Sequence, residues 1–231
     1  MMRTYIAVGV VAVAALAGSS GIARAVPINL VANGSFESYD TGNKVFTSWT
    51  NSGNQGTTPS QYAVPHPTDG VTAGPNGDTV PPDPFKFSPD AAGVSGAYFV
   101  ADNANQSLSQ TVKLTVGATY EVGFDLFPTL SGAANPNSFT FTGSIGSLVV
   151  TTANQVNTTA GTWQHFAQTF VATNASETFT FNFTSGPTAA KDVVADLVYV
   201  GTPLTRVPEP ASFALLGMGL LGAGMIRRRR A

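Results

Sequence analysis

The sequence predicts an all-β fold for the interior of the chain, an antiparallel β-sandwich. Apolar and polar residues alternate there in many short runs, and Gly, Asn and Pro residues separate these runs. A helical period is hard to find in the same region. Short, half-buried strands joined by such turns are typical of two sheets packed over one core.

The alternation is clearest in residues 119–127 and 177–184. The first run places four apolar side chains on one face, and the second places Phe179, Phe181 and Phe183 on one face. Further strands are expected at Ile28–Phe36, Ala97–Ala101, Ser107–Leu114, Ser138–Phe141, Ser147–Thr152, Thr162–Ala172 and Val193–Val200.

The N-terminus has the three parts of a secretory signal. A positive charge precedes an apolar run at residues 5–17, and Ala23 and Ala25 form an A-x-A cleavage site. The run is too short to span a bilayer comfortably, because a span needs about 20 apolar residues. We expect a signal helix in residues 1–25, removed by signal peptidase so that Val26 becomes the new N-terminus.

The C-terminus contains a second targeting pattern. Val207, Pro208, Glu209 and Pro210 precede an uncharged, mostly apolar run at 211–226, and Arg227, Arg228, Arg229 and Arg230 follow it. The run would reach about 24 Å as a helix, slightly short of the hydrocarbon core, and the arginines can extend it by snorkelling. The positive-inside rule keeps the arginines cytoplasmic. A transmembrane helix is therefore expected at 211–226.

These C-terminal residues resemble the PEP-CTERM sorting domain of Gram-negative bacteria, whose three parts they match in order and spacing. The resemblance implies an exosortase as processing partner and an inner-membrane intermediate. It also implies a destination at the cell surface or in an extracellular matrix, as in exopolysaccharide-rich biofilms. The expected division is a signal peptide at 1–25, an ectodomain at 26–203 and a sorting region at 204–231.

Charge is distributed unevenly along the chain. The two ends hold six of the 11 basic residues but one of the 13 acidic residues, which leaves the interior with five basic and 12 acidic residues and a net charge of −7. An acidic domain without a Lys/Arg patch argues against binding nucleic acid. It remains compatible with cations and neutral sugars.

Residues 63–89 depart from the strand pattern because they contain seven prolines. Proline removes ladder donors, so a central strand is not expected here. Long loops in compact domains are usually functional or disordered. We expect either a semi-rigid cover over a sheet edge or a ligand loop. The acids in and beside this segment are expected to be solvated turn residues: Asp69, Asp78, Asp83 and Asp90.

Motifs near both ends of the interior support a more specific fold. Residues 29–37 read N-L-V-A-N-G-S-F-E, Ser48-Trp49 follows, and residues 195–200 read A-D-L-V-Y-V. This pairing resembles the carbohydrate-binding-module and galactose-binding-like jelly rolls, which often begin with N-G-S-F-E and finish with a D-D-V-x-V strand. The resemblance implies a jelly roll and a sugar ligand.

The same resemblance implies a structural Ca²⁺ between the first and last strands. Glu37 and Asp196 match the acidic positions used there, but Leu197 stands where a second Asp would be. Because Ca²⁺ takes six to eight oxygen ligands, backbone carbonyls would have to complete the site. The alternative is that both residues are surface or ladder-capping acids.

Sugar sites in this fold use exposed aromatic rings for stacking, with amides and carboxylates for the hydroxyl groups. The candidates are Trp49, Tyr62, Phe85 and Phe87. Trp163 follows a glycine turn inside an expected strand, and we expect it in the core.

Catalytic patterns are not found. The chain has no cysteine, and its two histidines, His66 and His165, have no acidic motif nearby in sequence. No G-x-S-x-G elbow or nucleotide-binding loop occurs. We expect a noncatalytic surface protein that binds polysaccharide. The alternatives are a structural or adhesive protein, and a glycan hydrolase.

Overall fold

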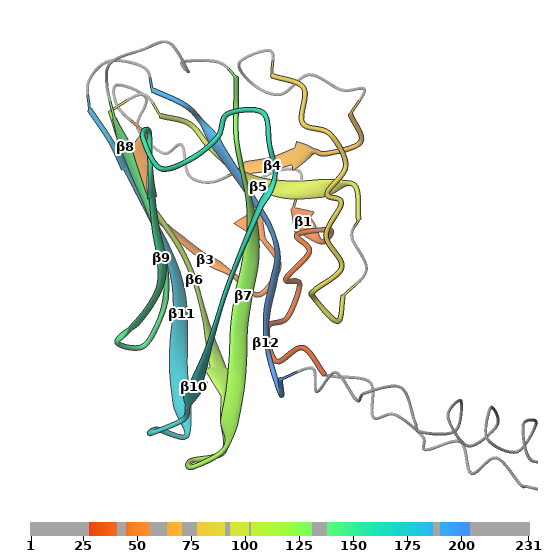
Figure 1. The fold of residues 1–231 in the computed structure, drawn as a ribbon, viewed down its shortest axis with the longest axis vertical. Coiled ribbons are helices and arrows are strands. Elements are labelled where there is room, and N and C mark those ends of the chain that lie inside the picture. Colours follow the sequence, from red (N-terminus) through yellow and green to blue (C-terminus); the bar gives the residue numbers. More distant parts are fainter. Residues whose placement is uncertain are drawn as a thin grey trace, which may run out of the picture.

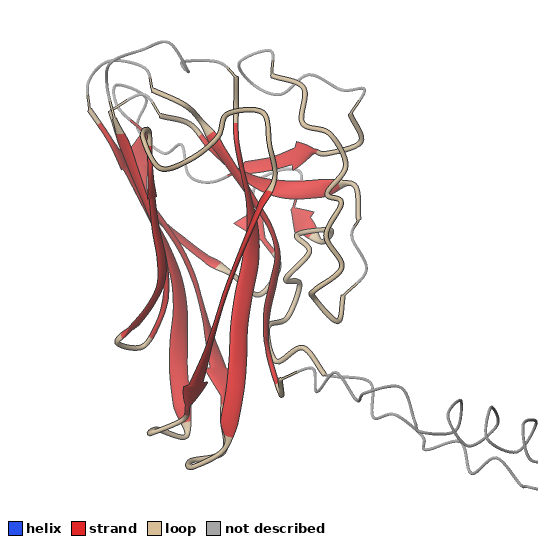
Figure 2. Ribbon diagram, viewed as in Figure 1, coloured by secondary structure: helices blue, strands red, loops and turns tan. Residues whose placement is uncertain are grey.

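The computed structural model describes residues 28–40, 45–55, 64–70, 78–90, 93–101, 103–130, 138–186 and 190–203. All regular structure in these ranges is strand, as Figure 2 shows. The two predicted terminal helices, the signal cleavage site and the sorting motif lie outside these ranges. Within them, no helix is long and apolar enough to cross a membrane.

Two five-stranded antiparallel sheets pack face to face (Figure 1). The first sheet has the order β10–β7–β12–β5–β4, formed by Gln164–Val171, Thr119–Pro128, Val193–Gly201, Ser95–Phe99 and Val64–Pro67. The second has the order β3–β6–β11–β8–β9, formed by Thr50–Gln55, Ala104–Lys113, Ser176–Ser185, Phe139–Ile145 and Leu148–Asn154. A small hairpin joins β1 (Tyr39–Asp40) to β2 (Val45–Phe46). The predicted β-sandwich is confirmed, with a jelly-roll-like arrangement.

The main core lies between the sheets and is built largely from phenylalanine. Phe181 of β11 is fully buried and its ring centroid lies 4.8 Å from that of Phe124 on β7, so this pair joins the two sheets. The ring centroids of Phe141 and Phe179 lie 4.9 and 4.8 Å from that of Phe181. The predicted alternation on β11 is confirmed, since its three phenylalanines are all inside.

The first sheet is also covered on its outer face. Tyr98, Phe127, Trp163 and Val194 form a second buried cluster with Val80. Val80 belongs to the proline-rich segment, whose part at 78–90 lies over this side of the sheet, away from the second sheet (Figure 1). The segment therefore covers a face of the sheet. Trp163 is 5% exposed, which confirms its predicted core position.

One predicted strand does not form, and one observed strand was not predicted. Ile28–Phe36 forms turns, because Asn33 and Phe36 adopt positive φ angles of 54° that a strand does not accommodate. Its backbone still joins the sheet through the Leu30 amide, which donates to the Val200 carbonyl at 2.8 Å. The Asn/Ser/Gly-rich strand β3 has no apolar alternation and was not expected.

Candidate functional site

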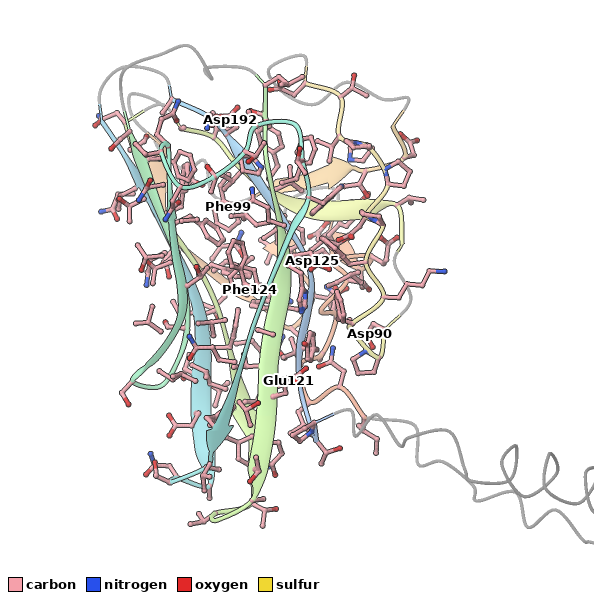
Figure 3. The ribbon with its side chains drawn as sticks, in the orientation of Figure 1. Asp90, Phe99, Glu121, Phe124, Asp125 and Asp192 are labelled. Atoms are coloured by element: carbon pink, nitrogen blue, oxygen red, sulfur yellow. The ribbon has the colours of Figure 1, made fainter. Side chains whose placement is uncertain are left out.

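A row of ionisable side chains crosses three adjacent strands of the first sheet. Asp125 on β7 stands directly opposite His165 on β10 and Asp196 on β12. Residues directly opposite one another in a ladder share a face of the sheet. Figure 3 shows Asp125 on the side of β7 away from Phe124, whose ring points between the sheets. The row therefore lies on the outer face, beneath residues 78–90.

His165 and Asp125 form a close pair between two adjacent strands. His165 Nδ1 lies 2.6 Å from Asp125 Oδ1. Asp125 is 1% exposed, whereas the His165 side chain is 18% exposed and reaches the surface. Burial raises the pKa of Asp125, and the hydrogen bond and charge of His165 oppose that rise.

Asp83 lies over this row and corrects the expectation of a solvated turn residue. Its Oδ1 accepts a hydrogen bond from the Phe85 amide at 2.8 Å, and its Oδ2 is buried and meets no N–H or O–H donor of the protein. Burial, followed by the charge of Asp125, raises the pKa of Asp83 to about 7.

Asp196 completes the row and is 1% exposed. Its Oδ1 accepts from the Leu197 amide at 2.7 Å, and its Oδ2 is buried without a hydrogen-bond partner. Burial raises its pKa well above the ordinary value, and the charges of Asp83, Asp125 and Glu37 add to the rise. A β-bulge follows Asp196, where Leu197 adopts a φ of 50°. Such strained backbone often marks a functional site.

Aromatic rings surround the exposed end of the row. The Phe87 ring stacks on His165 at a centroid distance of 4.1 Å, and Phe85 lies 5.8 Å from the same imidazole. Tyr199 stacks at 6.2 Å and donates its hydroxyl hydrogen to Glu121 at 2.7 Å. Phe87 is 37% exposed, so an aromatic surface borders a buried group of acids.

The predicted ligand-binding aromatic residues do not all lie at this site. Phe85 and Phe87 lie together at this site. Trp49 does not: it is 5% exposed, and its ring stacks parallel to Phe181 in the core. Because both faces of a core indole are covered, Trp49 is removed from the candidates. Tyr62 lies outside the described residues.

The charge of Glu37, one predicted calcium ligand, contributes to the raised pKa of Asp196, the other. Glu37 Oε1 accepts hydrogen bonds from the Val94 and Ser95 amides at 2.8 and 2.7 Å. The buried, unpartnered Asp196 Oδ2 is the kind of oxygen that Ca²⁺ binds. No group of three or more His, Asp or Glu residues in the described ranges is arranged to hold a metal ion. Backbone or water oxygens would have to supply most of a site.

The sequence analysis did not find the row itself. Its members come from separate strands and from the loop, and their association depends on the strand register. One signal was present: Asp125 interrupts the otherwise apolar run Val122–Phe127. A charged residue is almost never fully buried without a partner, and its partner here is His165.

Solved structures with similar folds come from several functional classes. TmCBM61 in complex with β-1,4-galactotriose is 15% identical, with coverage of 76% of this chain and 99% of that chain and a TM-score of 0.47. The Stig cyclase Fisc from Fischerella sp. TAU is 16% identical, with 76% and 97% coverage and a TM-score of 0.49. The K3 cleaved adhesin domain of Lys-gingipain from Porphyromonas gingivalis W83 is 14% identical, with 77% and 99% coverage and a TM-score of 0.46. These likenesses concern the fold alone.

No curated protein sequence matches the chain. Residues 206–230, in contrast, match the PEP-CTERM protein-sorting motif. This match confirms the predicted C-terminal motif, which implies processing by an exosortase. The chain carries a PEP-CTERM sorting motif and is an exported protein that is processed at the membrane.

Proposed function

We propose that the exported protein acts at the cell surface or in the extracellular matrix, where its ectodomain binds polysaccharide without catalysing a reaction. The observation that supports a sugar ligand is the half-exposed Phe87 ring stacked on His165. Aromatic faces pack against the apolar faces of sugar rings, and neighbouring polar groups can bind the hydroxyl groups. The acidic charge of the interior favours neutral over acidic polysaccharides.

Binding by the purified full chain to an array of neutral and acidic glycans tests this proposal. Replacing Phe87 with alanine is expected to weaken binding to any glycan ligand by about tenfold, because the stacking surface is lost. Tyr39→Ala is the matched control, since Tyr39 is also 37% exposed but belongs to the β1–β2 hairpin. No binding to any glycan, or equal losses in the two variants, would contradict the proposal.

A structural or adhesive role is the second candidate, and one observation favours it. The outer face of the first sheet is occupied by the protein's own residues 78–90, so Tyr98, Phe127 and Trp163 are buried. A row of aromatic rings exposed across that face would have favoured sugar binding more strongly. Binding to a protein or to whole cells, without binding to any glycan on the array, would support this second role.

The noncatalytic part of the proposal is supported by the burial of the acids. A glycosidase needs two carboxyl groups that reach the scissile bond. Asp125 and Asp196 are each 1% exposed, and Asp125 Oδ1 is held by His165 Nδ1 at 2.6 Å.

We further propose that Glu37 and Asp196 supply two oxygens to a structural Ca²⁺. Titration of the EDTA-treated protein with CaCl₂ is then expected to release or absorb heat and to raise the melting temperature, because an ion that binds only the folded state stabilises it. Asp196→Asn is expected to weaken both effects. If neither heat nor a melting shift is observed, Asp196 is instead a buried protonated acid, as its raised pKa allows.

A further inference from the structure

Strand β10 forms one edge of the first sheet, with β7 on its inner side. Just after the strand, the Ala172 amide donates to the carbonyl of Ala118, directly before β7, at 2.9 Å. Because hydrogen-bonded and non-hydrogen-bonded pairs alternate along an antiparallel ladder, the even-numbered residues of β10 bond to β7. The odd-numbered residues point their backbone N–H and C=O groups away from the sheet: His165, Ala167, Thr169 and Val171. β10 therefore presents a row of ladder donors and acceptors along its outer edge.

The other three edge strands of the two described sheets are each interrupted. β4 contains Pro65 and Pro67, β3 contains Gly53 at a φ of 96°, and β9 has a bulge at Val150, where its register with β8 shifts. Proteins protect exposed edges in these ways, because an open edge pairs with other chains. β10 has eight residues without proline, glycine, lysine, arginine or acid, and its register with β7 is unbroken. It is the edge that lacks these protections.

The sequence of β10 is close to a palindrome about Gln168. Residues 166–170 read Phe-Ala-Gln-Thr-Phe, so aromatic, small and amide positions follow the same order in both directions. A two-fold contact between identical chains needs a self-complementary surface of this kind. In an antiparallel pair of two β10 strands centred on Gln168, Phe166 lies opposite Phe170 of the second copy, and Ala167 lies opposite its Thr169. This register places the outward-facing residues in hydrogen-bonded pairs.

The side chains that would meet are incompletely covered in one copy. Phe166 and Phe170 are partly buried, with ring centroids 5.7 Å from that of Phe124 and 5.9 Å from that of Tyr120 on β7. Val171 is 57% exposed. Aromatic side chains directly opposite one another stabilise a sheet, and they lie closest in non-hydrogen-bonded pairs. A second β10 strand would therefore cover the remaining surface of both phenylalanines.

We propose that β10 is a dimerisation edge, which pairs antiparallel with β10 of a second copy across a two-fold axis at Gln168. The first sheets of the two copies then form one continuous sheet. This proposal does not rest on sugar binding, because it concerns contact between two protein chains.

The direction of the strands determines how such a pair is oriented. Because β10 and β12 both run antiparallel to β7, they run in the same direction. The two β12 strands of the pair therefore run in opposite directions, and Gly201 lies at opposite ends of the two copies. Copies paired in this way cannot stand side by side with both C-terminal ends toward one membrane. The arrangement suits copies released from the membrane, or copies on two facing surfaces.

The chain contains no cysteine, so one introduced thiol can report the register of the pair. Gln168→Cys would place two thiols at the two-fold axis, in a non-hydrogen-bonded pair whose Cα atoms lie about 4.5 Å apart, within disulfide range. Gln164→Cys is the matched control, because it changes the same residue type on the same face of the same strand. Its two thiols would lie about 27 Å apart in the proposed pair, at ~3.4 Å per residue.

The purified full chain of each variant is oxidised mildly and run on a non-reducing gel. We expect about tenfold more disulfide-linked dimer from Gln168→Cys than from Gln164→Cys, because only the first pair of thiols is within bonding distance. The rate of reaction with N-ethylmaleimide measures the accessibility of each thiol, and the dimer yields are normalised to it.

A second substitution tests whether the contact depends on the ladder. Thr169→Pro, added to Gln168→Cys, removes an N–H that faces the outer edge, a position where an edge strand tolerates proline. It should lower the dimer yield to that of Gln164→Cys. Thr169→Ala keeps the N–H and should leave the yield unchanged. Far-UV circular dichroism checks that each variant keeps its β-structure, and if Thr169→Pro unfolds, the two cysteine variants decide alone.

The proposal is overturned if neither cysteine variant forms the linked dimer, or if both form it equally. Equal yields would indicate random collision or association through other parts of the chain. A dimer yield that survives Thr169→Pro in a folded protein would equally contradict the proposal, because the contact would then not depend on backbone pairing at β10.

Discussion

Replacing Phe181 with alanine is expected to lower the free energy of unfolding by about 3–5 kcal/mol. Phe181 is fully buried at the centre of β11, and its ring contacts phenylalanines of both sheets, including Phe124 across the interface. The truncated side chain would leave a cavity between sheets whose strands are fixed by their ladders. Such a site cannot collapse to fill the space.

Chemical denaturation followed by fluorescence measures this effect. Val156→Ala is the control, because Val156 is 91% exposed, and it should change stability by less than about 0.5 kcal/mol. A loss below about 1 kcal/mol for Phe181→Ala would show that the phenylalanine core does not couple the two sheets as described.

Replacing Gly34 with alanine is expected to cost about 1–3 kcal/mol, the range for overpacking a site that cannot easily relax. A Cβ atom at this position would lie 2.0 Å from the Val198 carbonyl oxygen. That oxygen belongs to the backbone of β12, and the Val198 amide donates to the Gly34 carbonyl at 2.9 Å. The added methyl group would push the N-terminal segment away from the strand beside Asp196.

The same denaturation assay tests this substitution against Gly186→Ala. A Cβ at Gly186 would meet no atom within 4 Å, so that variant should retain the stability of the unmodified protein. Equal stability of the two variants would indicate that the segment at Gly34 shifts freely. The glycine in the N-G-S-F-E motif would then have no packing role.

The fold was predictable from the sequence because its strands are locally encoded. The alternation in β11 placed three phenylalanines on one face, and the structure buries all three. The predicted strand at Ile28–Phe36 was wrong for a local reason as well, because this segment turns at Asn33 and Phe36, which adopt positive φ angles. Where side-chain pattern and backbone conformation disagreed, the pattern alone gave a strand that does not exist.

The site was predictable only in part. Phe85 and Phe87 were found because aromatic residues in a proline-rich loop are conspicuous. Asp83 was misjudged, because aspartate between prolines is typical of a solvated turn and nothing local shows that the loop folds back onto a sheet. Its burial depends on the register that brings Asp125 and His165 together. Non-local placement of this kind has no signature in one sequence.

The last strand would have a mechanical consequence if the sorting region tethered the protein to the membrane through its C-terminus. β12 leads directly toward the sorting region and lies between β7 and β5 in the first sheet, while the Leu30 amide pairs with Val200 near its end. The hydrogen bonds of an antiparallel ladder run perpendicular to the strands. Tension from the membrane would therefore load the bonds between β12 and β7 in shear, many at once, instead of peeling them apart one by one. In that arrangement, the strand that bears the force would be an interior strand of its sheet.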